Sequence, residues 1–346
     1  MSRTAALAAR LEVPLLITAA TNVRYLTGFS SSNAALLVEP DASVTLYADF
    51  RYANRAREVE GVTFVQTTRN LLSAVAEHLA GRTIGFEAAH LSFRGYRTLV
   101  DAGLEAVPTS GQVEALRAVK DAGEIEAVRR AAALSDDVFE LLVNQSFVGR
   151  TERELAWWIE RELRERGAEG VSFPANVAAG ENAASPHAEP GDRRFEPGML
   201  VIVDAGCVVD GYCSDCTRTF GVGDVSERLL ELYALCLEAQ LAGLAAVGPG
   251  VTGTAADAAS RAPIEAAGLG DAFGHGLGHG VGAEIHEAPV LRPESSDTLA
   301  PGNVVTVEPG IYLPGECGVR IEDLVLVTED GNERLTAFTK ELVTVA

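Results

Sequence analysis

The pattern of apolar and polar positions divides the chain into two parts with different textures. In the first part, short apolar runs alternate with amphipathic stretches, which is typical of strands and helices packed in layers. The strands predicted there are Val13–Thr18, Ala34–Val38, Val44–Ala48, Val62–Gln66, Thr83–Phe86 and Leu104–Pro108. The predicted helices are Arg51–Glu60, Leu71–Ala80 and Phe93–Asp101. We therefore expect a smaller α/β domain over residues 1–112.

In the second part, residues 113–346, helices and strands are grouped instead of alternating. Amphipathic helices are predicted at Val113–Val143, Thr151–Arg166, Ser226–Val247 and Thr254–Ala267. Thr151 followed by Glu154 is a capping-box signature for the start of the second of these helices. Strand-like runs separated by Gly and Pro fill most of the remainder. This grouping predicts an α+β domain.

Composition and charge exclude several classes of protein. The 346 residues are 47% hydrophobic and 22% charged, a globular balance that fits about two domains. No run approaches about 18 consecutive apolar residues, and no secretory signal pattern is present, so we expect no membrane span and a cytoplasmic location. The 28 basic and 49 acidic residues give a net charge of −21, which argues against nucleic-acid binding.

The cysteines are expected to be reduced. Five is an odd number, and without a secretion signal it argues against a disulfide framework. Cys213 and Cys216 form a CxxC, but residues three apart on a strand point to opposite faces. With no second CxxC in the chain, we interpret both as structural thiols.

The histidines concentrate in a glycine-rich segment, Phe273–Pro289, with the sequence FGHGLGHGVGAEIHEAP. His275 and His279 are four residues apart, as in zinc-protease helices. Glycines at every second position from 274 to 282 are incompatible with a helix and favour an extended segment that other groups approach closely. Four residues of strand span about 13 Å, so both histidines reach one ion only where the chain bends.

Carboxylates interrupt apolar strands at two further places. VIVD ends at Asp204, Asp210-Gly211 is a hairpin turn signal, and the returning strand carries Asp215. Glu308 ends a third apolar run, and Glu322 lies in the next, with Arg320 as a candidate ion-pair partner. Buried carboxylates need compensation, either from a cation or from exposure at a strand end.

Together these segments supply four carboxylates and one imidazole: Asp204, Asp215, His279, Glu308 and Glu322. Four negative charges balance two divalent ions, and an oxygen-rich set suits Mn²⁺, Co²⁺ or Fe²⁺ better than a thiolate-rich zinc site does. Two such ions hold and activate a water molecule for attack on a carbonyl. The pattern therefore predicts a hydrolytic dinuclear centre.

The same segments resemble the pita-bread metallopeptidases, and within them the Xaa-Pro peptidases prolidase and aminopeptidase P. The matching stretches are GENAASPH, VIVDAGCVVDGYCSDCTRTF, GHGLGHGVGAEIHEAP, VEPGIY and GVRIED. Eleven residues separate Asp204 from Asp215, and fourteen separate Glu308 from Glu322, as in that family. The N-terminal part resembles the smaller creatinase-like domain of these enzymes, most clearly at the DFRY of Asp49–Tyr52.

The resemblance implies a role for each matching residue. The five residues above would be the metal ligands, with Asp215 and Glu322 bridging two ions, Mn²⁺ or Co²⁺, with Fe²⁺ or Zn²⁺ as alternatives. Glu308 would also be the general base. His187 and His286 would contact the substrate and stabilise the tetrahedral intermediate, while His275, Tyr312 and Arg320 would support the substrate pocket. The resemblance also implies a homodimer.

The expected reaction is hydrolysis of the Xaa-Pro imide bond in proline-containing dipeptides. A dipeptidase must recognise the carboxylate that ends its substrate, and a cation near the site would do so. Arg51 is the candidate for that cation, with Arg320 as the second. Aminopeptidase P, acting on longer Xaa-Pro-Xaa peptides, is the alternative. A methionine aminopeptidase-like hydrolase and a non-enzymatic pita-bread binding protein are the remaining interpretations.

Overall fold

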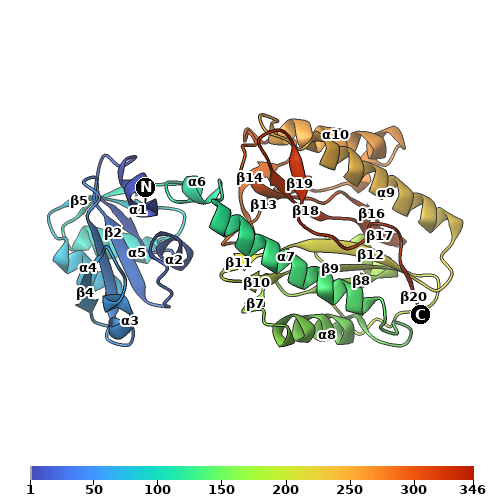
Figure 1. Ribbon diagram of the computed structural model, residues 1–346, viewed down its shortest axis with the longest axis horizontal. Helices are drawn as coiled ribbons and strands as arrows, with labels where there is room; N and C mark the ends of the chain where they lie inside the picture. Colours follow the sequence, from blue (N-terminus) through green and yellow to red (C-terminus); the bar gives the residue numbers. More distant parts are fainter. Residues whose placement is uncertain (1) are drawn as a thin grey trace. The chain divides into compact units, whose positions relative to one another are not determined.

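The computed structural model describes residues 2–346 and divides into two compact units, one ending at Arg117 and one beginning at Ala118 (Figure 1). The boundary predicted after residue 112 lies just before a short helix, α6 (Glu114–Arg117). Val113 and Leu116 pack into the core of the N-terminal unit, which is why this segment belongs to it.

The N-terminal unit is built on one mixed six-stranded sheet with the order β4-β3-β2-β1-β5-β6. β1 pairs antiparallel with β2, as β2 does with β3, and the other three pairings are parallel. The strands are β1 (Leu15–Ile17), β2 (Ala34–Val38), β3 (Val44–Asp49), β4 (Thr63–Thr67), β5 (Thr83–Glu87) and β6 (Glu105–Thr109). Leu15 and Ile17 enter one hydrophobic core and Leu16 enters another, so both faces of the sheet are covered.

The helices of this unit are α1 (Arg3–Ala8), α2 (Ala20–Thr27), α3 (Ala53–Arg57), α4 (Leu71–His78) and α5 (Phe93–Asp101), followed by α6. The sequence did not predict α1 and α2. The helix predicted over Arg51–Glu60 is confined to α3, because Asp49 accepts hydrogen bonds from the backbone and side chain of Arg51 and so forms a turn there.

The single helix predicted over Val113–Val143 is wrong. The chain forms α6, breaks, and resumes as α7 (Ala122–Leu142). Asp121 caps α7 by accepting from the backbone N–H of Glu124, whose side chain accepts from Asp121 in return. The backbone N–H of Lys120 is meanwhile bonded to the carbonyl of Gly302, so the break is held by a distant segment.

The C-terminal unit places two pairs of helices on either side of its strands (Figure 1). The helices are α7, α8 (Glu152–Glu165), α9 (Glu227–Ala246) and α10 (Gly253–Ala266), with short 3₁₀ turns η1 (Gly180–Ala184) and η2 (Gly270–Ala272). Phe139 of α7 stacks on Phe220 in the core beneath α7 and α8. Cys236 of α9 and Ile264 of α10 share a second core with Val319.

The strands of this unit form several small sheets. The two largest have the strand orders β20-β12-β9-β8 and β14-β13-β15-β18-β19. Their strands are β8 (Asn176–Ala179), β9 (Leu200–Ala205), β12 (Cys216–Val222), β13 (Gly278–Gly280), β14 (Glu287–Leu291), β15 (Val304–Val307), β18 (Asp323–Val327), β19 (Asn332–Arg334) and β20 (Thr344–Val345). The others are β7 (Gly170–Val171), β10 (Cys207–Val209), β11 (Tyr212–Cys213), β16 (Gly310–Leu313) and β17 (Cys317–Arg320).

Helix α9 is the one helix among residues 2–346 that is long and apolar enough to cross a membrane, with a mean hydropathy of 1.4 over its best window. Length and composition alone do not separate a membrane helix from a core helix. One face of α9 is buried in the core described above, and its Gln240 is bonded to Asp323. These contacts are those of a core helix.

All five cysteines, Cys207, Cys213, Cys216, Cys236 and Cys317, are free and buried. No disulfide forms within residues 2–346, which agrees with the expected reduced thiols.

Candidate metal centre and active site

A cavity of about 530 Å³ lies in the C-terminal unit, and all five predicted metal ligands line it: Asp204, Asp215, His279, Glu308 and Glu322. His187, His275, His286 and Arg320 line the same cavity. Segments separated by more than a hundred residues therefore meet at one place.

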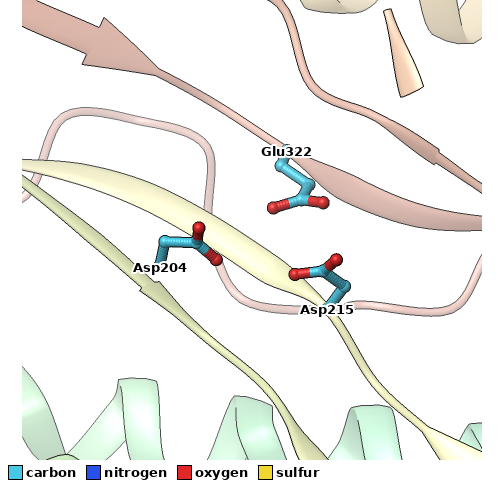
Figure 2. Close-up of side chains that lie close together, drawn as sticks. All are labelled: Asp204, Asp215 and Glu322. Atoms are coloured by element: carbon cyan, nitrogen blue, oxygen red, sulfur yellow. The ribbon is translucent and has the colours of Figure 1, made fainter. Parts of the chain in front are cut away.

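The first two carboxylates come from neighbouring antiparallel strands. Asp204 lies near the end of β9, opposite Thr217 of β12, and Asp215 immediately precedes β12. The predicted turn at Asp210-Gly211 joins β10 to β11, and both residues have positive φ, 51° and 79°. Figure 2 shows the carboxylates of Asp204 and Asp215 turned toward each other and toward Glu322. One oxygen from each of the three lies within 4.8 Å of the others.

The second pair of carboxylates stands at the ends of β15 and β18. The last residue of β15, Val307, pairs with Asp323, the first residue of β18, so Glu308 and Glu322 directly flank that pair. The hairpin of β16 and β17 occupies the chain between them. The backbone N–H of Glu322 donates to the carbonyl of Thr217, which joins this sheet to the one that carries Asp204.

His279 is oriented as a ligand would be. Its Nδ1 lies 3.1 Å from the carbonyl oxygen of Gly280, and because a carbonyl only accepts, Nδ1 carries the hydrogen. The Nε2 lone pair then faces the carboxylates, 3.4 Å from Glu308 Oε1 and 3.7 Å from Asp215 Oδ2. Burial lowers the pKa of His279, which favours the neutral form that binds metal.

The electrostatics of this cluster call for a cation. Burial, followed by the charge of neighbouring carboxylates, raises the pKa of Asp215 and Glu322 well above the usual range, and burial raises the pKa of Glu308. Asp204 Oδ1 and Glu322 Oε1 are buried and have no hydrogen-bond partner within residues 2–346. Orphaned buried oxygens are rare in proteins, and divalent ions would satisfy them. The residues present therefore fit the oxygen-rich metal centre.

Two threonines that the sequence did not single out donate hydrogen bonds to two of these carboxylates. Thr217 Oγ1 donates to Glu322 Oε2 at 2.7 Å, and Thr306 Oγ1 donates to Glu308 Oε1 at 3.0 Å. Behind Glu322, buried Asp323 pairs with Arg218 and with Lys340, both at 2.8 Å. Hydrogen bonds of this kind orient metal ligands.

Arg320 is paired differently from the prediction. Its guanidinium lies 2.7 Å from Asp204 Oδ2, not on Glu322, which is held by Thr217. The reason is that β17 lies beside β9 and β12: the backbone N–H of Arg320 donates to Thr219, and its Nε donates to Thr217. Arg320 therefore holds Oδ2 of Asp204, and Oδ1 of the same carboxylate is left for a metal ion.

His275 is connected to this arginine through Tyr312. Its Nδ1 faces the carbonyl of Gly276 at 2.8 Å and so carries the hydrogen, which leaves Nε2 as the acceptor for the Tyr312 hydroxyl at 2.9 Å. Arg320 in turn donates to the Tyr312 oxygen at 3.1 Å. Hydrogen bonds therefore connect His275, Tyr312 and Arg320 in series. His275 and Arg320 line the cavity, and Tyr312 lies behind them.

The glycines around His279 allow other backbone groups to approach closely, as the sequence predicted. The segment is extended, not helical, and β13 lies between β14 and β15. A Cβ atom at Gly278 would overlap the carbonyl oxygen of Thr306, and one at Gly280 would overlap that of Ala288. Only glycine permits this approach.

His187 precedes the five proposed ligands in the chain, and His286 lies between His279 and Glu308. The His286 ring meets His279 edge to face, with 4.3 Å between centroids. The next residue, Glu287, lies 2.7 Å from Lys120 Nζ, and neither side chain is more than 4% exposed. His187 lies in the loop after η1 and is exposed.

Arg51 belongs to the N-terminal unit, where its guanidinium pairs with Asp49 at 2.7 Å and lies over the Tyr52 ring. A different arginine, Arg292, lines the cavity directly after β14. Sequence reasoning missed it, although its position six residues after His286 placed it near the site.

Two family profiles match the chain. Residues 126–329 match Metallopeptidase family M24, and residues 8–119 match the Creatinase/Prolidase N-terminal domain. An uncharacterized peptidase, YqhT of Bacillus subtilis (strain 168), is 40% identical over 335 residues, which cover 95% of each chain. A second uncharacterized peptidase, SSP1059 of Staphylococcus saprophyticus, is 37% identical over 94% of this chain and 95% of its own length.

Solved structures agree over nearly the whole chain. An Xaa-Pro dipeptidase from Bacillus anthracis superposes with a TM-score of 0.95 at 37% identity, covering 99% of both chains. A prolidase from Pyrococcus horikoshii OT3 has a TM-score of 0.94 at 31% identity, covering 99% of this chain and 100% of its own. An X-Pro aminopeptidase from Thermotoga maritima MSB8 has a TM-score of 0.88 at 33% identity, covering 96% and 97%.

These matches confirm the predicted fold, a creatinase-type N-terminal α/β domain followed by an α+β pita-bread domain, and with it a peptidase that uses divalent metal ions. The chain belongs to metallopeptidase family M24.

Proposed function

We propose that this protein hydrolyses the imide bond of Xaa-Pro dipeptides with two divalent metal ions. The observation that carries the proposal is the convergence of four carboxylates and His279 in one cavity, where two carboxylate oxygens have no hydrogen-bond partner among the described residues. The names of the solved relatives, an Xaa-Pro dipeptidase and a prolidase among them, support the same substrate class.

The residues proposed to hold the ions are Asp204, Asp215, His279, Glu308 and Glu322, with Asp215 and Glu322 shared between the two. When bound, the ions polarise the substrate carbonyl and lower the pKa of a water molecule. Four carboxylates match the charge of two divalent ions, and the oxygen-rich set favours Mn²⁺ or Co²⁺, with Fe²⁺ or Zn²⁺ as alternatives.

Glu308 is proposed as the general base. Thr306 holds its Oε1, which leaves Oε2 to take a proton from the attacking water. The scissile nitrogen belongs to an imide and has no hydrogen, so it needs a proton before it leaves. Glu308 passes the proton that it took from the water to this nitrogen, and the carbon–nitrogen bond breaks. The water's hydroxyl thus ends on the carbonyl carbon and its proton on the nitrogen.

His187 and His286 are proposed to stabilise the negative charge that develops on the carbonyl oxygen. Burial lowers the pKa of His286, so its ring is a neutral hydrogen-bond donor. Preorganised donors of this kind supply much of the stabilisation in acyl-transfer reactions.

Arg292 is the group we favour for binding the substrate carboxylate. Arg292 and Arg320 are the arginines that line the cavity, and Arg320 is occupied by Asp204 and Tyr312. Arg292 is exposed and makes no ion pair within residues 2–346, so its guanidinium is available for a bidentate contact with a carboxylate. The role of Arg51 stays a prediction, and Arg51→Ala in the assay below tests it.

The experiment compares an Xaa-Pro dipeptide with an Xaa-Pro-Xaa tripeptide, after chelation and after restoration with Mn²⁺ or Co²⁺. We expect metal-restored cleavage that favours the dipeptide. Arg292→Ala should lower kcat/KM for the dipeptide by about 10–100-fold, the effect of losing a charged hydrogen bond, and for the tripeptide much less. Arg97→Ala, an exposed arginine of α5, is the matched control.

Each outcome has one interpretation. A preference for the tripeptide would assign the protein to aminopeptidase P with the metal centre unchanged. Metal-dependent cleavage only of peptides without proline would contradict the Xaa-Pro proposal and favour a methionine aminopeptidase-like enzyme. The cytoplasmic homodimer expected from the sequence is part of this proposal, and sedimentation of the holoenzyme tests its oligomeric state.

A further inference from the structure

Glu152 is a buried carboxylate that no step of the proposed reaction uses. It is 0% exposed and is the first residue of α8, directly after the N-cap Thr151. No arginine, lysine or histidine pairs with it within residues 2–346. Its charge is instead compensated by hydrogen-bond donors.

These donors come from both ends of one loop. Glu152 Oε1 accepts from the backbone N–H of Ala179 at 2.8 Å, and Oε2 accepts from that of Gly191 at 2.9 Å. The side-chain amide of Asn182 donates to both oxygens at 3.1 Å. A single carboxylate therefore ties together the start and the end of the segment 179–191.

The middle of this segment forms a wall of the active-site cavity. Pro186, His187 and Glu189 line it. His187 is exposed and its ring has no hydrogen-bond partner among the described residues, so its own side chain is not fixed by a contact. The carbonyl of Pro186 accepts from Asn176 at 3.1 Å and from Arg320 at 3.3 Å. The position of the His187 ring thus depends on how the loop backbone is anchored.

We propose that Glu152 is a positioning residue for His187: by accepting hydrogen bonds from both ends of the loop 179–191, it fixes the place from which His187 reaches the substrate. This inference rests on the proposed function for the role of His187. It requires a carboxylate, because the amide of glutamine accepts on one oxygen only and would turn its NH₂ group toward one of the backbone N–H donors.

The first test is a double-mutant cycle with an Xaa-Pro dipeptide. Glu152→Gln should lower kcat/KM about tenfold in the otherwise unchanged enzyme, in keeping with the cost of small misplacements. In the His187→Ala background, the same substitution should have an effect of less than about twofold, because the group it positions is gone. An equal loss in both backgrounds would overturn the proposal, since Glu152 would then act through general stability or the metal centre.

The second test does not depend on activity, so it separates a failure of this inference from a failure of the proposed function. Hydrogen exchange, followed by mass spectrometry, should accelerate at least about tenfold in peptides spanning 179–191 of Glu152→Gln and remain unchanged around the metal ligands. Unchanged exchange in 179–191, or acceleration spread over the whole unit, would refute the anchoring role.

Two further variants keep the tests interpretable. Glu165→Gln changes an exposed glutamate at the other end of α8 and should leave kinetics and exchange unchanged. Asn182→Ala removes the side-chain donor but keeps both backbone contacts, so it serves if Glu152→Gln does not fold. It should give a smaller change of the same kind, and no change in loop exchange would count against the proposal.

Discussion

Replacing Thr217 with valine removes its hydrogen bond to Glu322, a proposed metal ligand, while keeping the shape of the side chain. Thr217 is 0% exposed and Glu322 is 1% exposed, so water cannot replace the lost donor. A hydrogen bond to a charged group is worth about 1.5–3 kcal/mol, and outer-shell partners of metal ligands typically govern about 10–100-fold in metal affinity. We therefore expect the Thr217→Val enzyme to bind Mn²⁺ about 10–100-fold more weakly.

The assay is competition for Mn²⁺ against a chelator of known affinity, with kcat measured at saturating metal. Activity should recover largely when enough Mn²⁺ is supplied, because the ligands themselves remain. The matched control is Thr219→Val. Thr219 lies two residues along the same strand, is also buried, and bonds to the backbone of Arg320 instead of to a ligand carboxylate.

Both substitutions should lower the free energy of unfolding by about 1–3 kcal/mol, since each leaves buried polar groups unpaired. Only Thr217→Val should change the affinity for Mn²⁺. If the two variants bind the metal equally well, or if Thr217→Val binds it as tightly as the unchanged protein, then the hydroxyl does not tune the ligand and the reasoning is refuted.

Two further predictions concern stability. Asp215→Asn should abolish metal binding yet raise the melting temperature in EDTA, because it removes a buried charge. Since burial raises the pKa of Asp215, this gain in melting temperature should be absent near pH 3.8 and grow as the pH increases. A lower melting temperature than that of the unchanged protein in EDTA at pH 7 would contradict this prediction. Gly278→Ala should destabilise the fold by at least about 3 kcal/mol in urea unfolding, because its methyl group would overlap the Thr306 carbonyl. Gly274→Ala, whose added Cβ would have no neighbouring atom within 4 Å, should be nearly neutral. Similar losses of stability for both variants would refute the steric account.

Many of the strands and the proposed ligand residues were accessible from the sequence because they depend on local pattern. The alternation of glycines predicted an extended His279 segment, and Asp210-Gly211 predicted the turn that brings Asp215 back beside Asp204. The break before α7 was accessible too, since Asp121 and Glu124 form the same capping signature that marked α8 at Thr151.

What the sequence did not predict depends on contacts between distant segments. The partner of Arg320 is decided by the placement of β17 against β9, and a sequence offers Glu322, two residues away, as readily as Asp204. The hydroxyl of Thr217 bonds to Glu322, which lies more than a hundred residues further along the chain. Threonine is common in strands, so no local signal distinguishes this one.

The two lysines of the chain, Lys120 and Lys340, have a practical consequence through their ion pairs. Lys120 Nζ is enclosed with Glu287, beside His286, and Lys340 Nζ is bonded to Asp323, beside Glu322. Amine-acylating reagents react with the unprotonated, solvent-exposed amine, so neither side chain should be labelled while these pairs are closed. The rate at which each lysine is acylated therefore measures how often the protein opens on one side of its active centre or the other, without any probe having to be introduced.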